Sequence, residues 1–187
     1  MRPSSGFLLR FFALAGLLFA LWSFAGLGDA YARAVIAVAN PLMYVTSRFR
    51  VERTVPTLNG LDVVLRHERT EVVMPLQPRE LFSGVIPFLA LLGATAALPI
   101  RRRLRAAALG LAVLFLFHMG LMVLGPYMTG MPQARLGEQW MLRINRVIDV
   151  FYAFYGLVGY AALPFLLWFF LTQRGRLAPR QSDPPRA

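Results

Sequence analysis

The sequence contains no cysteine, no lysine and only two histidines among its 187 residues. Without cysteine the chain has no disulfide, no thiolate nucleophile and no cysteine-ligated metal. With two histidines, a zinc-type site would also need carboxylates, and the spacing of the acidic residues suggests none. We therefore expect neither a metal nor another cofactor.

Acidic residues are also scarce, since nine Asp and Glu stand against twenty arginines and leave a net charge of +11. So basic a chain would suit nucleic-acid binding. Many of its arginines, however, lie beside apolar runs, where arginine sets membrane topology and pairs with anionic lipid head groups. The chain is 57% hydrophobic with a mean hydropathy of +0.55, which is too apolar for an ordinary soluble domain. The composition predicts an integral membrane protein that contacts lipids and binds no nucleic acid.

Four apolar runs have the length of ~20 residues that a helix needs to cross a bilayer. They predict an all-α integral membrane protein, a four-transmembrane-helix bundle with a small extracytoplasmic β-rich insert between the first two helices. The first run has a rival interpretation as a cleaved signal peptide, because Ala30-Tyr31-Ala32 resembles a cleavage site. Its length exceeds the usual apolar core of such peptides, which favours an uncleaved helix. The predicted crossings are 7–27, 80–100, 104–127 and 148–171.

An arginine cluster between the second and third runs is expected to fix the orientation. Basic residues in a short loop resist translocation and hold the adjoining helix ends in the cytoplasm. This orientation puts both chain ends inside and the segments after the first and third crossings outside. The same guanidinium groups are candidates for contacts with lipid head groups. The cluster comprises Arg101, Arg102, Arg103 and Arg105.

The segment 29–79 changes character along its length. Its first part is apolar but contains Asn40-Pro41, and we expect an interfacial helix that ends there, because proline disfavours helical geometry in the preceding residue. From residue 49 onward apolar and polar residues alternate with a period of two, and Asn59-Gly60 suits a tight hairpin turn. The alternation predicts a three-stranded antiparallel meander outside the membrane.

These predictions divide the chain into five segments. Residues 1–28 form a short cytoplasmic N-terminus and the first transmembrane helix, and 29–79 form the interfacial helix and the meander. Residues 80–128 form the second and third transmembrane helices, joined by the cytoplasmic arginine loop. An extracytoplasmic amphipathic loop and the fourth helix occupy 129–172, and 173–187 form a polar cytoplasmic tail that we expect to be disordered.

Two groups of polar residues are candidate sites. His118 falls within the third predicted crossing, where ionisable side chains are uncommon and usually face the helix bundle. It suits proton handling, a ligand contact, or a structural hydrogen bond of a neutral imidazole. At the start of the fourth crossing, polar residues recur at steps of three or four on one helical face. That face predicts an external cleft for a peptide or an anionic head group, or else a structural anchor. The cleft residues are Asn145, Arg146, Asp149 and Tyr152.

Three stretches of the sequence carry a resemblance to a known family. They are "FLLRFFALAGLLFALW", "GATAALPIRRRLRAAALGLAVLFLFH" and "YAALPFLLWFF". With the strand-rich segment between the first two, they resemble the exosortase H-associated membrane proteins. The resemblance covers most of the chain and lies in its layout. It implies a multi-pass protein of the bacterial inner membrane that partners an exosortase, a peptidase of a protein-sorting system. Exosortases act through a cysteine, so no catalytic residue carries over to this chain.

The function we expect is therefore non-enzymatic. The chain would be an accessory or scaffold protein of the inner membrane that presents its extracytoplasmic surface, the meander with the Asn145–Tyr152 cleft, to an exosortase-like integral membrane partner. The alternatives are an enzyme of the membrane interface or a protein that binds anionic lipid. Both would use Arg146, Asp149 and His118.

Overall fold

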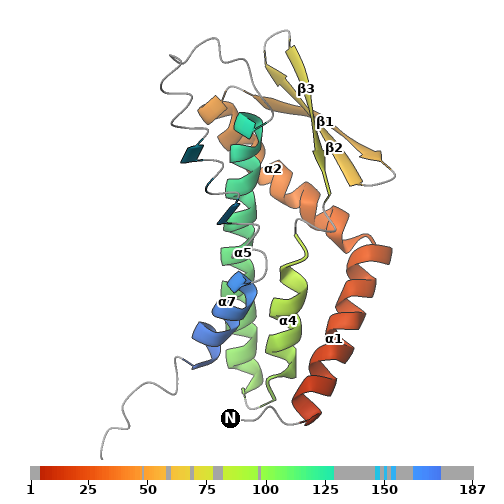
Figure 1. Ribbon diagram of the computed structural model, residues 1–187, viewed down its shortest axis with the longest axis vertical. Helices are drawn as coiled ribbons and strands as arrows, with labels where there is room; N and C mark the ends of the chain where they lie inside the picture. Colours follow the sequence, from red (N-terminus) through yellow and green to blue (C-terminus); the bar gives the residue numbers. More distant parts are fainter. Residues whose placement is uncertain are drawn as a thin grey trace, which may run out of the picture.

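The computed structural model describes residues 5–47, 49–57, 60–67, 70–77, 82–96, 98–128, 146–147, 150, 153–154 and 162–173. Within them the elements, in chain order, are α1 (Ser5–Phe24), α2 (Leu27–Ser47), β1 (Arg50–Thr57), β2 (Gly60–His67), β3 (Thr70–Leu76), α4 (Val85–Ala94), α5 (Ile100–Met128) and α7 (Ala162–Gln173). Helices α1, α4, α5 and α7 run side by side, α2 crosses above α4, and the sheet lies at the α2 end of the molecule (Figure 1).

The prediction of an all-α, four-transmembrane-helix bundle is wrong. The described residues form five helices and a three-stranded antiparallel sheet, and only two of these helices are long and apolar enough to cross a membrane. These two are α1 and the part of α5 over Ile100–Gly125. They suggest that the chain associates with a membrane.

The second predicted crossing is replaced by a short helix. Helix α4 has ten residues and measures only about 15 Å at ~1.5 Å per residue, half the hydrocarbon thickness of ~30 Å. It ends because Thr95 leaves helical geometry, with a ψ of 81°, and donates its hydroxyl hydrogen to the Leu91 carbonyl at 2.7 Å. Pro87 falls in its first turn, where a missing N–H costs no helical hydrogen bond. The apolar run 80–100 therefore forms a helix only over Val85–Ala94 and does not form a helix of crossing length.

Helix α7 is also short, with 12 residues, Ala162–Gln173. It coincides with the end of the fourth predicted crossing. Most of that run lies outside the described residues, so the described part of the chain gives no fourth helix of crossing length.

Helix α2 passes through Pro41 and ends at Ser47, so the predicted end at Asn40-Pro41 is wrong. A proline inside a helix removes one backbone hydrogen bond. The buried side chains nevertheless stay on one helical face beyond it, because Val35, Ala39 and Met43 follow at four-residue steps. Burial of this face holds the helix past the proline.

The arginine cluster lies in the first turns of α5 and not in a loop. Arg103 turns back from there, and its Nη2 donates to the carbonyl of Thr95 at 2.9 Å and to that of Leu98 at 3.2 Å. It therefore closes the connection between α4 and α5. Both α1 and α5 begin at the end of the molecule far from the sheet (Figure 1).

Helices α1 and α2 meet at a tight turn. Gly26 adopts a φ of 72°, a left-handed conformation that favours glycine. Helix α1 then packs along α4, where Gly93 is so close to Leu14 that a Cβ on it would lie 2.7 Å from the leucine Cδ1. Apart from Trp22, α1 buries no side chain fully, and Leu9 is 73% exposed. An apolar helix this exposed differs from the core helix of a soluble protein.

The sheet has the order β1-β2-β3 with both pairs antiparallel, and lies in the segment whose alternation predicts strands. One face packs on the helices through Leu61, Val63 and Leu65 of β2. Met74 on the same face lies against the end of α5, so close that a Cβ on Gly125 would sit 2.6 Å from its sulfur. This contact fastens the sheet to α5.

The outer face of the sheet carries paired charges. A bulge between Val51 and Arg53 shifts the register of β1 and sets Arg53 beside Val64 and not on the face of Val51. Two ion pairs span this face, Arg66–Glu52 at 2.8 Å and Arg53–Glu71 at 3.9 Å. Val64 lies among them and is only 4% exposed, although it faces away from the core.

Candidate functional site

The described residues cover little of the predicted external cleft. Arg146 lies in a short helical stretch and is exposed to solvent. Asn145, Asp149 and Tyr152 lie outside the described residues. The cleft therefore stays a prediction.

His118 lies in the interior, where it meets a residue that the sequence did not single out. Its side chain is 2% exposed. The hydroxyl of Tyr31, from α2, lies 2.9 Å from its Nδ1. The pair joins two elements 87 residues apart in the chain, α2 and α5, which pack extensively against each other.

The Tyr31 phenol keeps its proton in this hydrogen bond. Burial raises the pKa of the Tyr31 phenol to about 12, so it keeps its proton at neutral pH. The phenol donates to Nδ1 of His118 when the imidazole carries its proton on Nε2, and accepts from Nδ1–H in the other tautomer. The bond pairs a polar atom of the buried His118 side chain, so the pair is suited to joining helices.

Aromatic rings enclose the pair. The Phe82 ring lies 4.9 Å from the imidazole of His118, and the Phe115 ring meets Tyr31 edge-on at 5.9 Å with an interplanar angle of 88°. Trp22 of α1 completes the row, 5.5 Å from Tyr31. Edge-to-face contacts of this kind stabilise aromatic clusters beyond their buried area. Side chains from α1, α2 and α5 and from the turn before α4 thus meet at one point.

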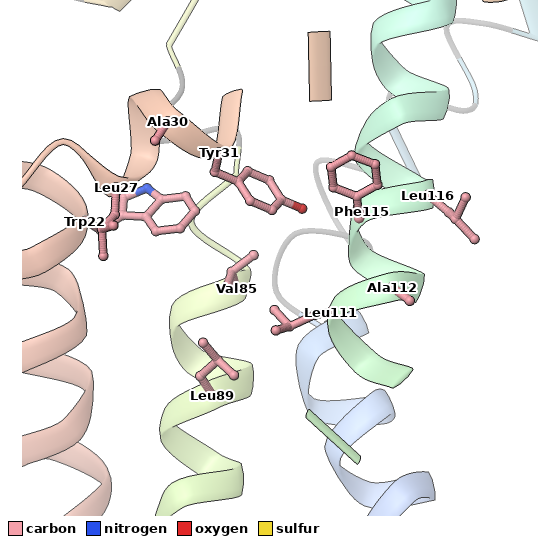
Figure 2. Close-up of a pocket in the computed structure, with 10 residues that line it drawn as sticks. All are labelled: Trp22, Leu27, Ala30, Tyr31, Val85, Leu89, Leu111, Ala112, Phe115 and Leu116. Carbon is pink, nitrogen blue, oxygen red and sulfur yellow. The ribbon is translucent and has the colours of Figure 1, made fainter. Parts of the chain in front are cut away.

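An open pocket of about 730 Å³ adjoins this cluster. It lies below α2, between α1 on one side and α5 on the other, with α4 beneath (Figure 2). The Tyr31 ring reaches into it from above (Figure 2). Nearly all of its lining is apolar, and the lining residues are Trp22, Leu27, Ala30, Tyr31, Val85, Leu89, Leu111, Ala112, Phe115 and Leu116.

The Trp22 indole forms one wall of the pocket and carries an unused donor. Its Nε1 is buried and has no hydrogen-bond partner among the described residues. The backbone of Gly28 covers this nitrogen, since a Cβ on Gly28 would lie 2.8 Å from it. Only glycine leaves the room that the indole needs at this position.

The arrangement favours binding of apolar groups. The polar groups around the pocket, the Tyr31–His118 pair and the Trp22 nitrogen, are buried in an apolar surrounding. In the described part of the chain, no three His, Cys, Asp or Glu side chains lie close enough together to hold a metal ion. A pocket of this size and lining suits a hydrocarbon chain.

The predicted lipid-contacting arginines are at the other end of α5. Arg101, Arg102 and Arg105 are exposed, and Arg103 is half-buried through its bonds to the α4–α5 connection. They do not meet His118 or the pocket. The structure therefore separates the basic cluster from the aromatic site.

Sequence reasoning missed Tyr31 and Trp22. Tyr31 lies in the possible signal-cleavage site, and Trp22 lies in the first predicted crossing, where nothing distinguished it from its neighbours. One signal was available, since the two aromatics flank Ala25-Gly26, a small pair at which a helix breaks readily, and a turn there brings them together.

Comparison of the chain with known protein families, with curated proteins and with solved structures gives no match.

Proposed function

We propose that the chain is a non-enzymatic accessory protein of the bacterial inner membrane, which α1 and α5 cross and from which the sheet projects on the extracytoplasmic side. The proposal is supported by the presence of an exposed apolar surface and an exposed charged surface on different parts of the molecule. Helix α1 exposes apolar side chains along its whole length, while the outer face of the sheet exposes ordered ion pairs. The first surface suits lipid and the second suits a protein partner in water.

The orientation rests on the arginines. Arg101, Arg102 and Arg105 are exposed at the start of α5, the end of the molecule away from the sheet. Basic residues at a helix end keep that end in the cytoplasm. The amino terminus of α1 lies at the same end (Figure 1), which supports a cytoplasmic start of the chain.

Cysteine labelling tests this topology directly, because the chain contains no cysteine that would have to be removed. We expect Val73→Cys, which replaces an exposed residue on the outer sheet face, to react with an impermeant maleimide in spheroplasts. Arg102→Cys should react only after lysis. Reaction of the second variant in sealed spheroplasts, or release of the wild-type chain by alkaline carbonate, would overturn the proposed placement.

The proposed partner is an exosortase-type protein-sorting enzyme, as the resemblance to exosortase H-associated proteins implies. The docking surface would be the outer sheet face, where Arg53 and Glu71 pair across β2. A charge swap separates docking from folding. Arg53→Glu/Glu71→Arg keeps an ion pair within the sheet but reverses the pattern that a partner meets.

We expect the double variant to accumulate normally and to lose co-purification with the exosortase from mild detergent. Arg10→Gln, an exposed arginine of α1 outside the basic cluster, is the control and should keep the complex. Undiminished capture by the double variant would rule out this face as the docking surface. Loss of sorting in a His118→Gln variant at normal abundance and with an intact complex would favour the enzymatic alternative.

A further inference from the structure

We propose that the pocket below α2 binds one acyl chain of an anionic membrane phospholipid, whose phosphate lies near Arg33. The inference rests on the proposed membrane location but not on the proposed partner. It assigns to the aromatic cluster a role as the wall of a lipid site.

The lining of the pocket matches the apolar character of an acyl chain. The open pocket of about 730 Å³ is lined by aliphatic and aromatic side chains from four helices, and the Tyr31 hydroxyl is already hydrogen-bonded to His118. The pocket therefore offers an acyl chain contacts that need no hydrogen bond. An acyl chain fills such a pocket through van der Waals contacts, whereas a polar ligand would leave its groups unpaired here.

The pocket opens onto the surface that we propose to face lipid. Leu27 and Leu116, on opposite rims, are both largely exposed, as is Phe24 at the end of α1. These exposed residues come from α1, α2 and α5, so the opening adjoins the apolar surface of the two helices that are long enough to span, α1 and α5. In a bilayer, acyl chains and not water lie against such an opening.

Arg33 provides a positive charge on the exposed face of α2. Arg33 follows Ala30 by one helical turn on the exposed face of α2, and the described residues give it no ion pair. The acid nearest in sequence is Asp29, four residues earlier, and no salt bridge joins the two in the described structure. Trp22 and Tyr31 are in ring contact beside the pocket, and tryptophan and tyrosine are enriched at membrane interfaces. A lipid with its chain between them would place its phosphate beside the free guanidinium.

Quenching of Trp22 fluorescence by brominated lipid tests the site. The protein is reconstituted in nanodiscs of phosphatidylglycerol that carries bromine on the acyl chain, and the Trp22 signal is the difference between wild type and Trp22→Phe. This difference cancels the signals of Trp140 and Trp168, which are present in both proteins. Although Trp22 is only 7% exposed, we expect strong quenching, because it forms a wall of the pocket.

A filled pocket is the decisive control. Ala112→Phe places a ring in the pocket and should abolish most of the quenching. Ala108→Phe introduces the same ring one turn earlier on α5, at an exposed position outside the pocket, and should leave quenching unchanged. Equal quenching in both variants, or none in the wild type, would overturn the proposal.

A tryptophan in place of exposed Leu9 on α1 reports on the membrane location by itself. Quenching of the Leu9→Trp reporter without quenching of Trp22 would refute the lipid site and leave the membrane placement intact. Absence of both signals would refute the two together.

The phosphate contact is tested by changing the head group. We expect about fivefold stronger quenching by a low fraction of brominated phosphatidylglycerol than of brominated phosphatidylcholine, the factor that corresponds to ~1 kcal/mol for one arginine at an anionic surface. Arg33→Gln should remove this preference, whereas Arg10→Gln, on α1, should keep it. A preference that survives in Arg33→Gln would overturn the assignment of the head group.

Discussion

The hydrogen bond between Tyr31 and His118 gives the sharpest prediction of stability. Tyr31→Phe keeps the ring that packs on Phe82, Phe115 and Trp22 and removes only the hydroxyl. The Nδ1 atom of His118, a side chain that is 2% exposed, then loses its hydrogen-bond partner. A buried polar group left unpaired costs ~1–3 kcal/mol, while hydrogen bonds between membrane helices average ~0.6 kcal/mol. We expect a loss of about 1 kcal/mol in the free energy of unfolding, within the range of these two sets of measurements.

The measurement is a double-mutant cycle with His118→Leu, with unfolding followed by circular dichroism in mixed micelles. A loss of 1 kcal/mol lowers the melting temperature by ~2–4 °C in a chain of this size. The double variant should be no less stable than the worse single variant, because both partners of the bond are gone. Losses that add to within ~0.3–0.5 kcal/mol would show that the two residues are independent, and would refute the assigned bond.

Wild type and Tyr31→Phe should also differ in how their free energy of unfolding changes with pH. The phenol of Tyr31 has a pKa of about 12 in the folded chain against an ordinary value of 10, so folding favours its protonated form. Its contribution is full below pH ~10 and is lost as the pH rises towards ~12. Wild type should therefore lose more stability than Tyr31→Phe in this window, since the remaining tyrosines titrate in both. Parallel pH profiles would contradict the burial of the phenol.

Two further predictions concern packing and the attachment of the sheet. Gly110→Ala should lower the free energy of unfolding by ~1–3 kcal/mol, because its Cβ would overlap the Phe88 ring. Gly120→Ala has open space around its Cβ and should stabilise α5 by up to ~1 kcal/mol. Thermal melts of the two variants test this, and equal shifts in melting temperature would contradict the packing of α4 on α5. Asn40→Ala removes the side-chain oxygen that accepts the Val51 N–H at 2.9 Å, so we expect faster amide exchange at Val51 and a loss of ~1 kcal/mol; unchanged exchange there would show that the amide has another acceptor.

The sequence predicts the strands well and the helix lengths poorly. Alternation from residue 49 and the turn at Gly60 lead to the observed meander, because a sheet with one buried face imposes a period of two. The alternation fails at Glu52, where the bulge moves Arg53 to the outer face. Nothing in the pattern marks such an extra residue, since its position depends on the partner strand.

The apolar runs misled for a different reason. Hydropathy measures composition, and the run at 80–100 has the composition of a crossing, yet its helix ends at Ala94, where Thr95 leaves helical geometry. Of the candidate sites, His118 could be found because an ionisable residue in an apolar run stands out. Its partner could not, because the contact depends on the turn at Gly26 that folds α2 back over α5.

The seat of Met74 against Gly125 links the sheet to the far end of the longest helix. With 29 residues, α5 measures about 43 Å at ~1.5 Å per residue, more than a hydrocarbon layer of ~30 Å. If it crosses the bilayer as proposed, a thinner membrane increases its inclination. The sheet would tilt with α5, so bilayer thickness would set the angle at which the outer sheet face meets the proposed partner.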